Sequence, residues 1–232
     1  MSLSSSHDWP ITPLSSSLSV SANQPLPSLS TTQEKRIESI WASALTKHPT
    51  LYNGRVFCAD IIEPSHIYGH WSEYRRVLAQ MKQPDIYGHH PLRPLAVVGL
   101  MRVKEGVVIG RRSPNAIYLP HYWQGVPAGN VESRERESTI NLANQLIAEC
   151  QEELGLEPAE CKIGIPLLAC EHPSSHIVDI GLSLGVSLSF DELRQRSHDK
   201  GNAEYDALEL ILPHSPPSQN IVPTLKAMLE RS

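Results

Sequence analysis

Hydrophobic residues recur every three or four positions in several segments of the chain, a spacing that places them on one face of a helix. This pattern predicts helices over 31–48, 70–81 and 137–154, and a closing helix within 217–231. The third of these segments is followed directly by Gly155, a residue typical of helix C-termini.

Other segments carry short apolar runs bounded by turn residues, which is the pattern of β-strands. Residues 94–113 predict two strands joined by a turn at 104–106. Residues 161–188 predict two more, one on each side of the polar loop 172–176, and a further strand is expected over 203–213.

These elements divide the chain into three parts. The first thirty residues hold eleven serines and four prolines, with no lysine or arginine, so a disordered tail is expected over 1–30. Residues 31–92 are expected to form an N-terminal lobe, in which 51–64 is a hairpin or bent strand with its turn at Asn53–Gly54. Residues 93–232 alternate strands and helices and predict a sheet between helices.

Composition narrows the class of protein. A net charge of −5 argues against a general nucleic-acid or membrane binder, which would need a basic surface. No apolar run approaches the length of a membrane span. The four cysteines form no CxxC pair and the eleven histidines show no zinc-ligand spacing, so we expect reduced thiols, a cytoplasmic location and no zinc site.

An acidic cluster lies at the end of the third predicted helix. Glu149, Glu152 and Glu153 stand at positions i, i+3 and i+4, so their carboxylates fall on one helical face. We expect these glutamates to point outward, while an apolar stripe packs the helix on the sheet; the stripe consists of Leu142, Leu146, Cys150 and Leu154. Crowded carboxylates either spread into solvent or share a hard cation such as Mg²⁺.

The segment upstream favours the second alternative. Trp123, Pro127 and Gly129 predict the end of a strand followed by a tight loop that leads into the acidic helix. This order of parts resembles the Nudix box, in which a glycine-containing loop precedes a helix with the pattern R-E-x-x-E-E-x-G and an aliphatic residue. The match consists of Gly129, Glu149, Glu152, Glu153, Gly155 and Leu156.

Two features depart from the family pattern. Ala148 stands where the family has an arginine, and the distance from Gly129 to that position is five residues longer than usual. Five extra helical residues would rotate Glu135, the family's early glutamate by count, away from the other glutamates. Arg134 or Arg136 is the candidate replacement for the missing arginine.

The resemblance implies a fold and an activity. The fold is a Nudix-type α/β/α sandwich with a mixed β-sheet, here with an N-terminal extension. The activity is Mg²⁺-dependent hydrolysis, with Mn²⁺ as a second option, of the diphosphate linkage in a nucleoside diphosphate joined to another group. Candidate substrates are a nucleotide sugar, a dinucleotide or a nucleotide, and a homodimer stays open.

The resemblance also assigns roles to residues. Glu149, Glu152 and Glu153 are the expected metal ligands, with Glu149 and Glu152 as catalytic groups. Arg111 and Arg112 are expected to contact phosphates. The general base is one of the box glutamates or an acid on the later strand, Glu204 or Glu209. The alternative is a Nudix-like protein that binds a nucleotide or a partner with little or no turnover, which the alanine at 148 favours.

Overall fold

The structure is a computed structural model that describes residues 9–133, 138–212 and 220–231. Its larger β-sheet has the strand order β1–β9–β10–β5–β6–β11. These strands are β1 (Ile11–Pro13), β5 (Leu95–Arg102), β6 (Val107–Arg112), β9 (Cys161–Glu171), β10 (Val178–Val186) and β11 (Tyr205–Ile211). β5 and β10 pair in parallel while the other neighbours are antiparallel, so the sheet is mixed, as predicted.

Two short strands pair with β5 and β6 where these two strands diverge. β7 (Trp123–Gly125) pairs with β6, whereas β8 (Ala128–Asn130) pairs with β5. β5 and β6 pair directly only near their turn, at Met101 and Arg102. The two strands therefore separate further along, and β7 and β8 fill the space between them.

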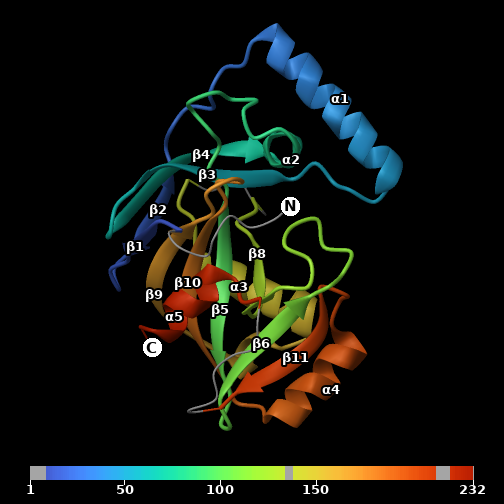
Figure 1. Cartoon of the computed structure of the whole chain (residues 1–232). Coiled ribbons are helices and arrows are strands. Elements are labelled where there is room, and N and C mark those ends of the chain that lie inside the picture. The colour runs from blue at the N-terminus through green and yellow to red at the C-terminus, as the bar shows by residue number, and fades with distance from the viewer. Residues whose placement is uncertain (1–8, 134–137, 213–219, 232) are drawn as a thin grey trace.

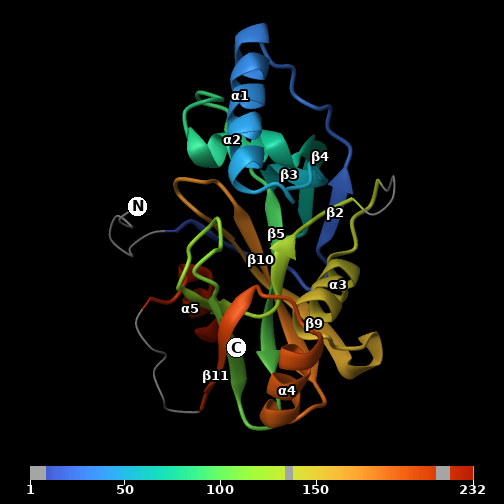
Figure 2. The same ribbon diagram turned by 90° about the vertical axis from the view of Figure 1, so that its right-hand side faces the viewer.

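Helices cover both faces of the sheet. α3 (Leu142–Leu154) and α4 (Phe190–Lys200) lie on one face and α5 (Pro223–Leu229) on the other, with β5 and β10 between α3 and α5 (Figure 2). A single 3₁₀ turn, Pro158–Glu160, connects α3 to β9. The expected α/β/α arrangement is confirmed.

Local sequence sets both ends of α3. The Asn141 side chain accepts a hydrogen bond from the backbone N–H of Asn144, and Gly155 ends the helix in the left-handed conformation with φ 65°. The predicted stripe is confirmed, because Leu142, Leu146, Cys150 and Leu154 are all buried.

The predicted start of this helix near 137 is wrong. Residues 138–141 are not helical: the Ile140 N–H donates to the Val20 carbonyl, and Thr139 bridges to Ser21. This pairing with β2 keeps Thr139 and Ile140 out of the helix. The expected rotation of Glu135 assumed that the helix continues through these residues, which it does not. Glu135 itself lies outside the described residues.

The N-terminal part forms a second sheet with two helices, which lie at one end of the larger sheet (Figure 1). Its strand order is β2–β4–β3, and its elements are β2 (Ser19–Ala22), α1 (Thr31–Lys47), β3 (Arg55–Ile62), β4 (His66–Glu73) and α2 (Tyr74–Lys82).

Two expectations for this part need correction. Asn53–Gly54 precedes β3 instead of forming the hairpin turn, which lies where the Glu63 N–H donates to the His66 carbonyl. The helix expected from 70 begins at Tyr74, because residues up to Glu73 pair with β3. α1, in contrast, ends before Pro49 as predicted.

The prediction of a disordered tail over 1–30 is wrong for residues 9–30; residues 1–8 lie outside the described part. β1 pairs with the edge strand β9 and β2 with β4. Val20 is buried in the main core, and Trp9 packs edge-on against His172 at 4.5 Å between ring centroids. A few buried apolar side chains are enough to order this segment, because its strands pair with strands of the two sheets.

One hydrophobic core joins the two sheets. It combines Phe57 and Ile67 from the small sheet with Val97 and Met101 from β5 and Leu146 from α3. The proposed boundary at 92/93 stays a prediction. All four cysteines are free thiols, and none of the helices in the described ranges is long and apolar enough to cross a membrane.

Candidate active site

Gly129, which was expected in a loop, lies in the short strand β8 and is close to the first box glutamate. A Cβ placed on Gly129 would lie 2.3 Å from the carboxyl carbon of Glu149, far inside van der Waals contact. Only glycine fits at this position while Glu149 keeps its place. Gly129 and Glu149 are twenty residues apart in the chain, and their close approach joins β8 and α3 in one site.

Two of the three box glutamates, Glu149 and Glu153, face strand β8. Glu149 accepts a hydrogen bond from the Gln145 side-chain amide at 2.6 Å. Glu153 accepts from the backbone N–H of Ala128 at 3.1 Å and from the Tyr205 hydroxyl at 2.7 Å. Both glutamates are buried.

The expectation that all three glutamates point outward is therefore wrong for two of them. Positions i and i+4 share a line along the helix, and this line turns Glu149 and Glu153 toward β8. Glu152 is exposed on the same helix and is not among the residues that line the cavity described next.

A cavity of about 430 Å³ lies in front of this pair. β8 and α3 contribute Gly129, Glu149 and Glu153, and the strand ends contribute Arg112, Asp179 and the adjoining Glu204. Helix α2 of the N-terminal part and the loop 115–118 also line it. The volume is in the range usual for small-molecule sites.

Acidic groups dominate the cavity. Four carboxylates line it, those of Glu149, Glu153, Asp179 and Glu204, with Arg112 as the basic residue among the lining side chains described. Burial and the neighbouring Glu149 and Glu204 raise the pKa of Glu153 well above its usual range, although the bond from Tyr205 opposes this shift. Burial likewise raises the pKa of Asp179 to about 6.

The two candidate arginines have different surroundings. Arg112 is held by three partners: it donates to the Tyr118 carbonyl and to the Gln124 side chain, and pairs with Glu204 at 3.0 Å. Arg111 pairs with Asp206 and lies over the Trp123 ring, outside the cavity lining. Of the two, Arg112 is placed to meet a bound molecule.

A chain of polar contacts connects Arg112 to Glu153. Arg112 donates to Gln124 at 3.1 Å, Gln124 contacts the Tyr205 hydroxyl at 3.4 Å, and this hydroxyl donates to Glu153. Burial and the adjacent Glu153 raise the pKa of Tyr205, so its hydroxyl stays a donor. Sequence reasoning missed Gln124 and Tyr205, because neither belongs to a motif.

The two acids proposed on the later strand also differ in their position relative to the cavity. Glu204 lines the cavity next to Arg112, whereas Glu209 is exposed and does not line it. Asp179 and Gln145 were not singled out either. Asp179 stands alone in an apolar strand, and a polar residue in such a run was the one signal that could have identified it.

The donor set fits a hard divalent ion in its chemistry, since the cavity offers carboxylate oxygens from several elements. Within the described residues, however, no three His, Cys, Asp or Glu side chains are gathered closely enough to enclose a metal. Glu149 lies against Gly129 and Glu153 accepts from the Ala128 N–H, so these two acids would form the inner part of such a site.

The position at which the family has an arginine is buried in this structure. Ala148 is buried at 7% exposure, so an arginine there would have to displace its neighbours or bury its charge. Arg134 and Arg136, the candidate replacements, lie outside the described residues.

Comparison with protein-family models and with curated proteins finds no match for this chain. Solved structures give weak similarities. A Nudix hydrolase from Nitrosomonas europaea is 16% identical with a TM-score of 0.39, covering 75% of this chain and 86% of its own. The Nudix hydrolase RenU from M. smegmatis is 14% identical with a TM-score of 0.40, covering 60% and 83%.

A MutT protein from Methanosarcina mazei is 17% identical with a TM-score of 0.36, covering 51% of this chain and 75% of that protein. Two of these three proteins are named Nudix hydrolases, the family that the motif resembles. Such low scores carry no conclusion about this chain, so its function has to be argued from the cavity.

Proposed function

We propose that this protein is a Nudix-type hydrolase that cleaves the diphosphate linkage of a nucleoside diphosphate joined to another group, with Mg²⁺ or Mn²⁺ as cofactor. One observation carries the proposal: Gly129, Glu149 and Glu153 meet at the wall of a cavity large enough for a small molecule. These are residues of the motif, brought together from a loop and a helix.

The charge of the cavity supports a metal cofactor. A diphosphate is an anion, and the ionised carboxylates of this lining would repel it. Divalent cations remove this repulsion, because they bind both the carboxylates and the phosphate oxygens. A bound divalent ion would neutralise the phosphate and lower the pKa of a coordinated water.

The chain's own groups have distinct parts in this proposal. Glu149 and Glu153 hold the ion, with Glu152 nearer to solvent, and the Tyr205 hydroxyl and the Ala128 N–H fix the Glu153 carboxylate. Arg112 contacts the phosphates. We propose Glu204 as the acid outside the motif that can take a proton, since it reaches the cavity.

The test is release of phosphate or nucleoside monophosphate from nucleotide sugars, dinucleotides and nucleoside triphosphates, with Mg²⁺, with Mn²⁺ and with a chelator. We expect turnover of at least one class, and its loss on chelation. Turnover that is unchanged by the chelator would contradict the metal, and no turnover of any class would contradict the hydrolase.

Three matched substitutions test the assignment of the glutamates. Glu149→Gln and Glu153→Gln each keep volume but remove a charge, and we expect either to lower kcat by about a hundredfold or more. Glu152→Gln should cost less, because its side chain is exposed and lies outside the cavity. Equal losses for all three, measured on one substrate, would show that Glu152 belongs to the inner site.

A second candidate function is binding without turnover, which the buried Ala148 favours, since the family's arginine has no room there. In this case a nucleotide should bind in the presence of Mg²⁺ and stay intact. Calorimetry followed by analysis of the recovered nucleotide separates the two functions.

A further inference from the structure

The cavity extends away from the glutamates across three strands. Asp179 on β10 and Asn130 on β8 are both register partners of Ala96 on the central strand β5. All three residues line the cavity. Two strand spacings put Asp179 about 10 Å from Asn130, and the small Ala96 leaves room between them.

Part of the cavity wall is apolar, alongside polar lining residues such as Arg112 and Asn115. Val77 and Met81 come from helix α2, Ile117 from the loop 115–118, and Ile177 from the position just before β10. Two apolar walls contributed by different elements suit a ring better than a sugar or a phosphate, which would leave its hydroxyl or charged groups without partners.

Two of the polar lining residues, Asp179 and Tyr118, could bind a polar edge of a ring. One oxygen of Asp179 accepts a hydrogen bond from the Thr224 hydroxyl at 2.6 Å, which fixes the carboxylate. The Tyr118 hydroxyl is buried and has no hydrogen-bond partner of normal geometry among the described residues. The Tyr118 ring packs edge-on against His172, 5.2 Å between centroids. The cavity lining thus combines a fixed acceptor and a buried hydroxyl with the apolar side chains.

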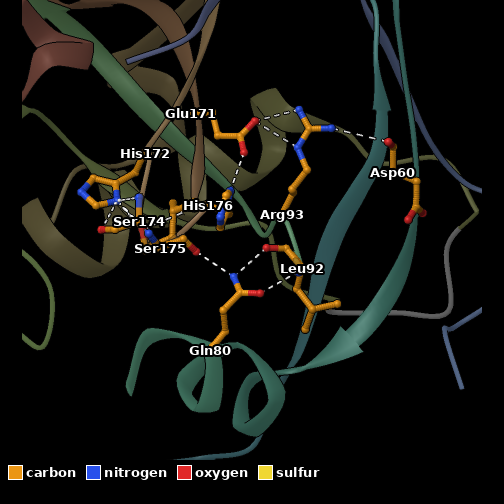
Figure 3. A network of polar contacts seen from close by, with 10 residues as sticks. Asp60, Gln80, Leu92, Arg93, Glu171, His172, Ser174, Ser175 and His176 are labelled. Carbon is orange, nitrogen blue, oxygen red and sulfur yellow. Dashed lines mark hydrogen bonds and ion pairs between the residues drawn. The ribbon is translucent and has the colours of Figure 1, made fainter. Parts of the chain in front are cut away.

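The α2 wall is held in place by a buried side chain. The Gln80 amide donates to the carbonyls of Leu92 and Ser175, both at 2.8 Å, and its oxygen accepts from the Leu92 N–H. Figure 3 shows Gln80 reaching from α2 to both segments. Since Ser175 is two residues before Ile177, this contact ties the two walls together.

We propose that this end of the cavity is a subsite for a planar heteroaromatic ring, the base of the substrate nucleoside, which places an N–H group toward Asp179. The inference rests on the proposed function, because it takes the diphosphate to lie at the glutamates. It adds that helix α2, from the N-terminal part, determines which molecules fit.

Binding of reaction products tests the subsite without any turnover. Calorimetry would compare AMP, GMP, CMP and UMP with ribose 5-phosphate, which has no base, all in the presence of Mg²⁺. At least one nucleotide should bind about tenfold or more tightly than ribose 5-phosphate. Asp179→Asn should reduce this ratio to about threefold or less, while the affinity for ribose 5-phosphate stays the same.

A second pair of variants tests the apolar wall. Ile117→Ser, in the loop, should weaken the preferred nucleotide about threefold or more and leave ribose 5-phosphate unaffected. Ile165→Ser is the matched control, since Ile165 is an exposed isoleucine outside the cavity, and it should change neither affinity.

Several results would overturn the subsite: ribose 5-phosphate binding as tightly as every nucleotide, no nucleotide binding at all, or Asp179→Asn leaving the ratio unchanged. If a nucleotide binds selectively through Asp179 but no substrate is hydrolysed, the proposed function fails and the subsite stands. The two failures are therefore distinguishable.

Discussion

At the scale of single residues, Gly129 is the strongest constraint on the site. Gly129→Ala would push a methyl group into the Glu149 carboxylate, so either the loop or Glu149 must move. We expect a loss in kcat of about a hundredfold, since displacements of an ångström cost that much in a positioned site. The cost in unfolding free energy should be about 1 to 3 kcal/mol.

Gly185→Ala in β10 is the matched control, because its Cβ would meet only ordinary contacts, at 3.9 Å from Lys162. It should leave kcat and stability nearly unchanged. If Gly129→Ala were as active as Gly185→Ala, the contact between the loop and Glu149 would have no catalytic importance.

Asp179 predicts a pH dependence of stability. Its pKa is raised from 3.8 to about 6 by burial, so between these values the folded protein binds the proton more tightly than the unfolded chain. Stability from this group is therefore full below pH 3.8 and is lost as the pH rises through 6. The loss amounts to at most about 3 kcal/mol.

Asp179→Asn cannot lose a proton, and Thr224 can still donate to its amide oxygen. Relative to wild type, the variant should gain unfolding free energy between pH 4 and pH 7.5, as measured by urea titration at both values. The exposed Asp85→Asn is the surface control. A gain at pH 4 that disappears at pH 7.5 would reverse the predicted sign.

At the scale of elements, the position of α2 depends on Gln80. Gln80→Leu keeps the volume roughly but leaves the Leu92 N–H and the carbonyls of Leu92 and Ser175 without their side-chain partner. We expect a loss of about 3 kcal/mol or more in unfolding free energy. KM should rise with little change in kcat, because α2 lines the cavity away from the glutamates.

Gln195→Leu on α4 is the control, since Gln195 is exposed and bonds only to its neighbour Asp199 among the described residues. It should alter neither stability nor KM. A Gln80→Leu variant with reduced kcat and unchanged KM would mean that α2 acts on the reaction centre and not on substrate fit.

At the scale of the whole molecule, the N-terminal segment belongs to the fold. Removing residues 1–24 would take away β1, β2 and the buried Val20. We expect the truncated chain to melt at a clearly lower temperature. Val20→Ala should alone cost about 2 kcal/mol, which corresponds to roughly 4 to 8 °C in a chain of this length.

Ser16→Ala, at an exposed position in the same segment, should leave the melting temperature unchanged. Calorimetric melting of the three variants checks this prediction. If the truncated chain were as stable as the full one, residues 9–24 would contribute nothing to the stability of the core.

The sequence by itself determined the elements with strong local signals. Periodicity and end residues located α1, the core of α3 and the strand pairs β5–β6 and β9–β10, because these signals act within one element. The motif named both Gly129 and Glu149, but their close approach is a result of the fold. Residues 70–73 fit the pattern of a helix as well as that of a strand, so local signals did not determine their conformation. Pairing with β3 makes them a strand.

Tertiary structure decided what depends on partners distant in the chain. It turned Glu149 and Glu153 inward and brought Tyr205 to Glu153. It also paired Ile11–Pro13 and Ser19–Ala22 with neighbouring strands, and it placed α2, Arg112 and Asp179 in the lining of one cavity. The physical reason is that burial and hydrogen bonding of these groups arise only when separate elements meet. Their residue types carry no local preference for such contacts, so spacing along the chain cannot encode them.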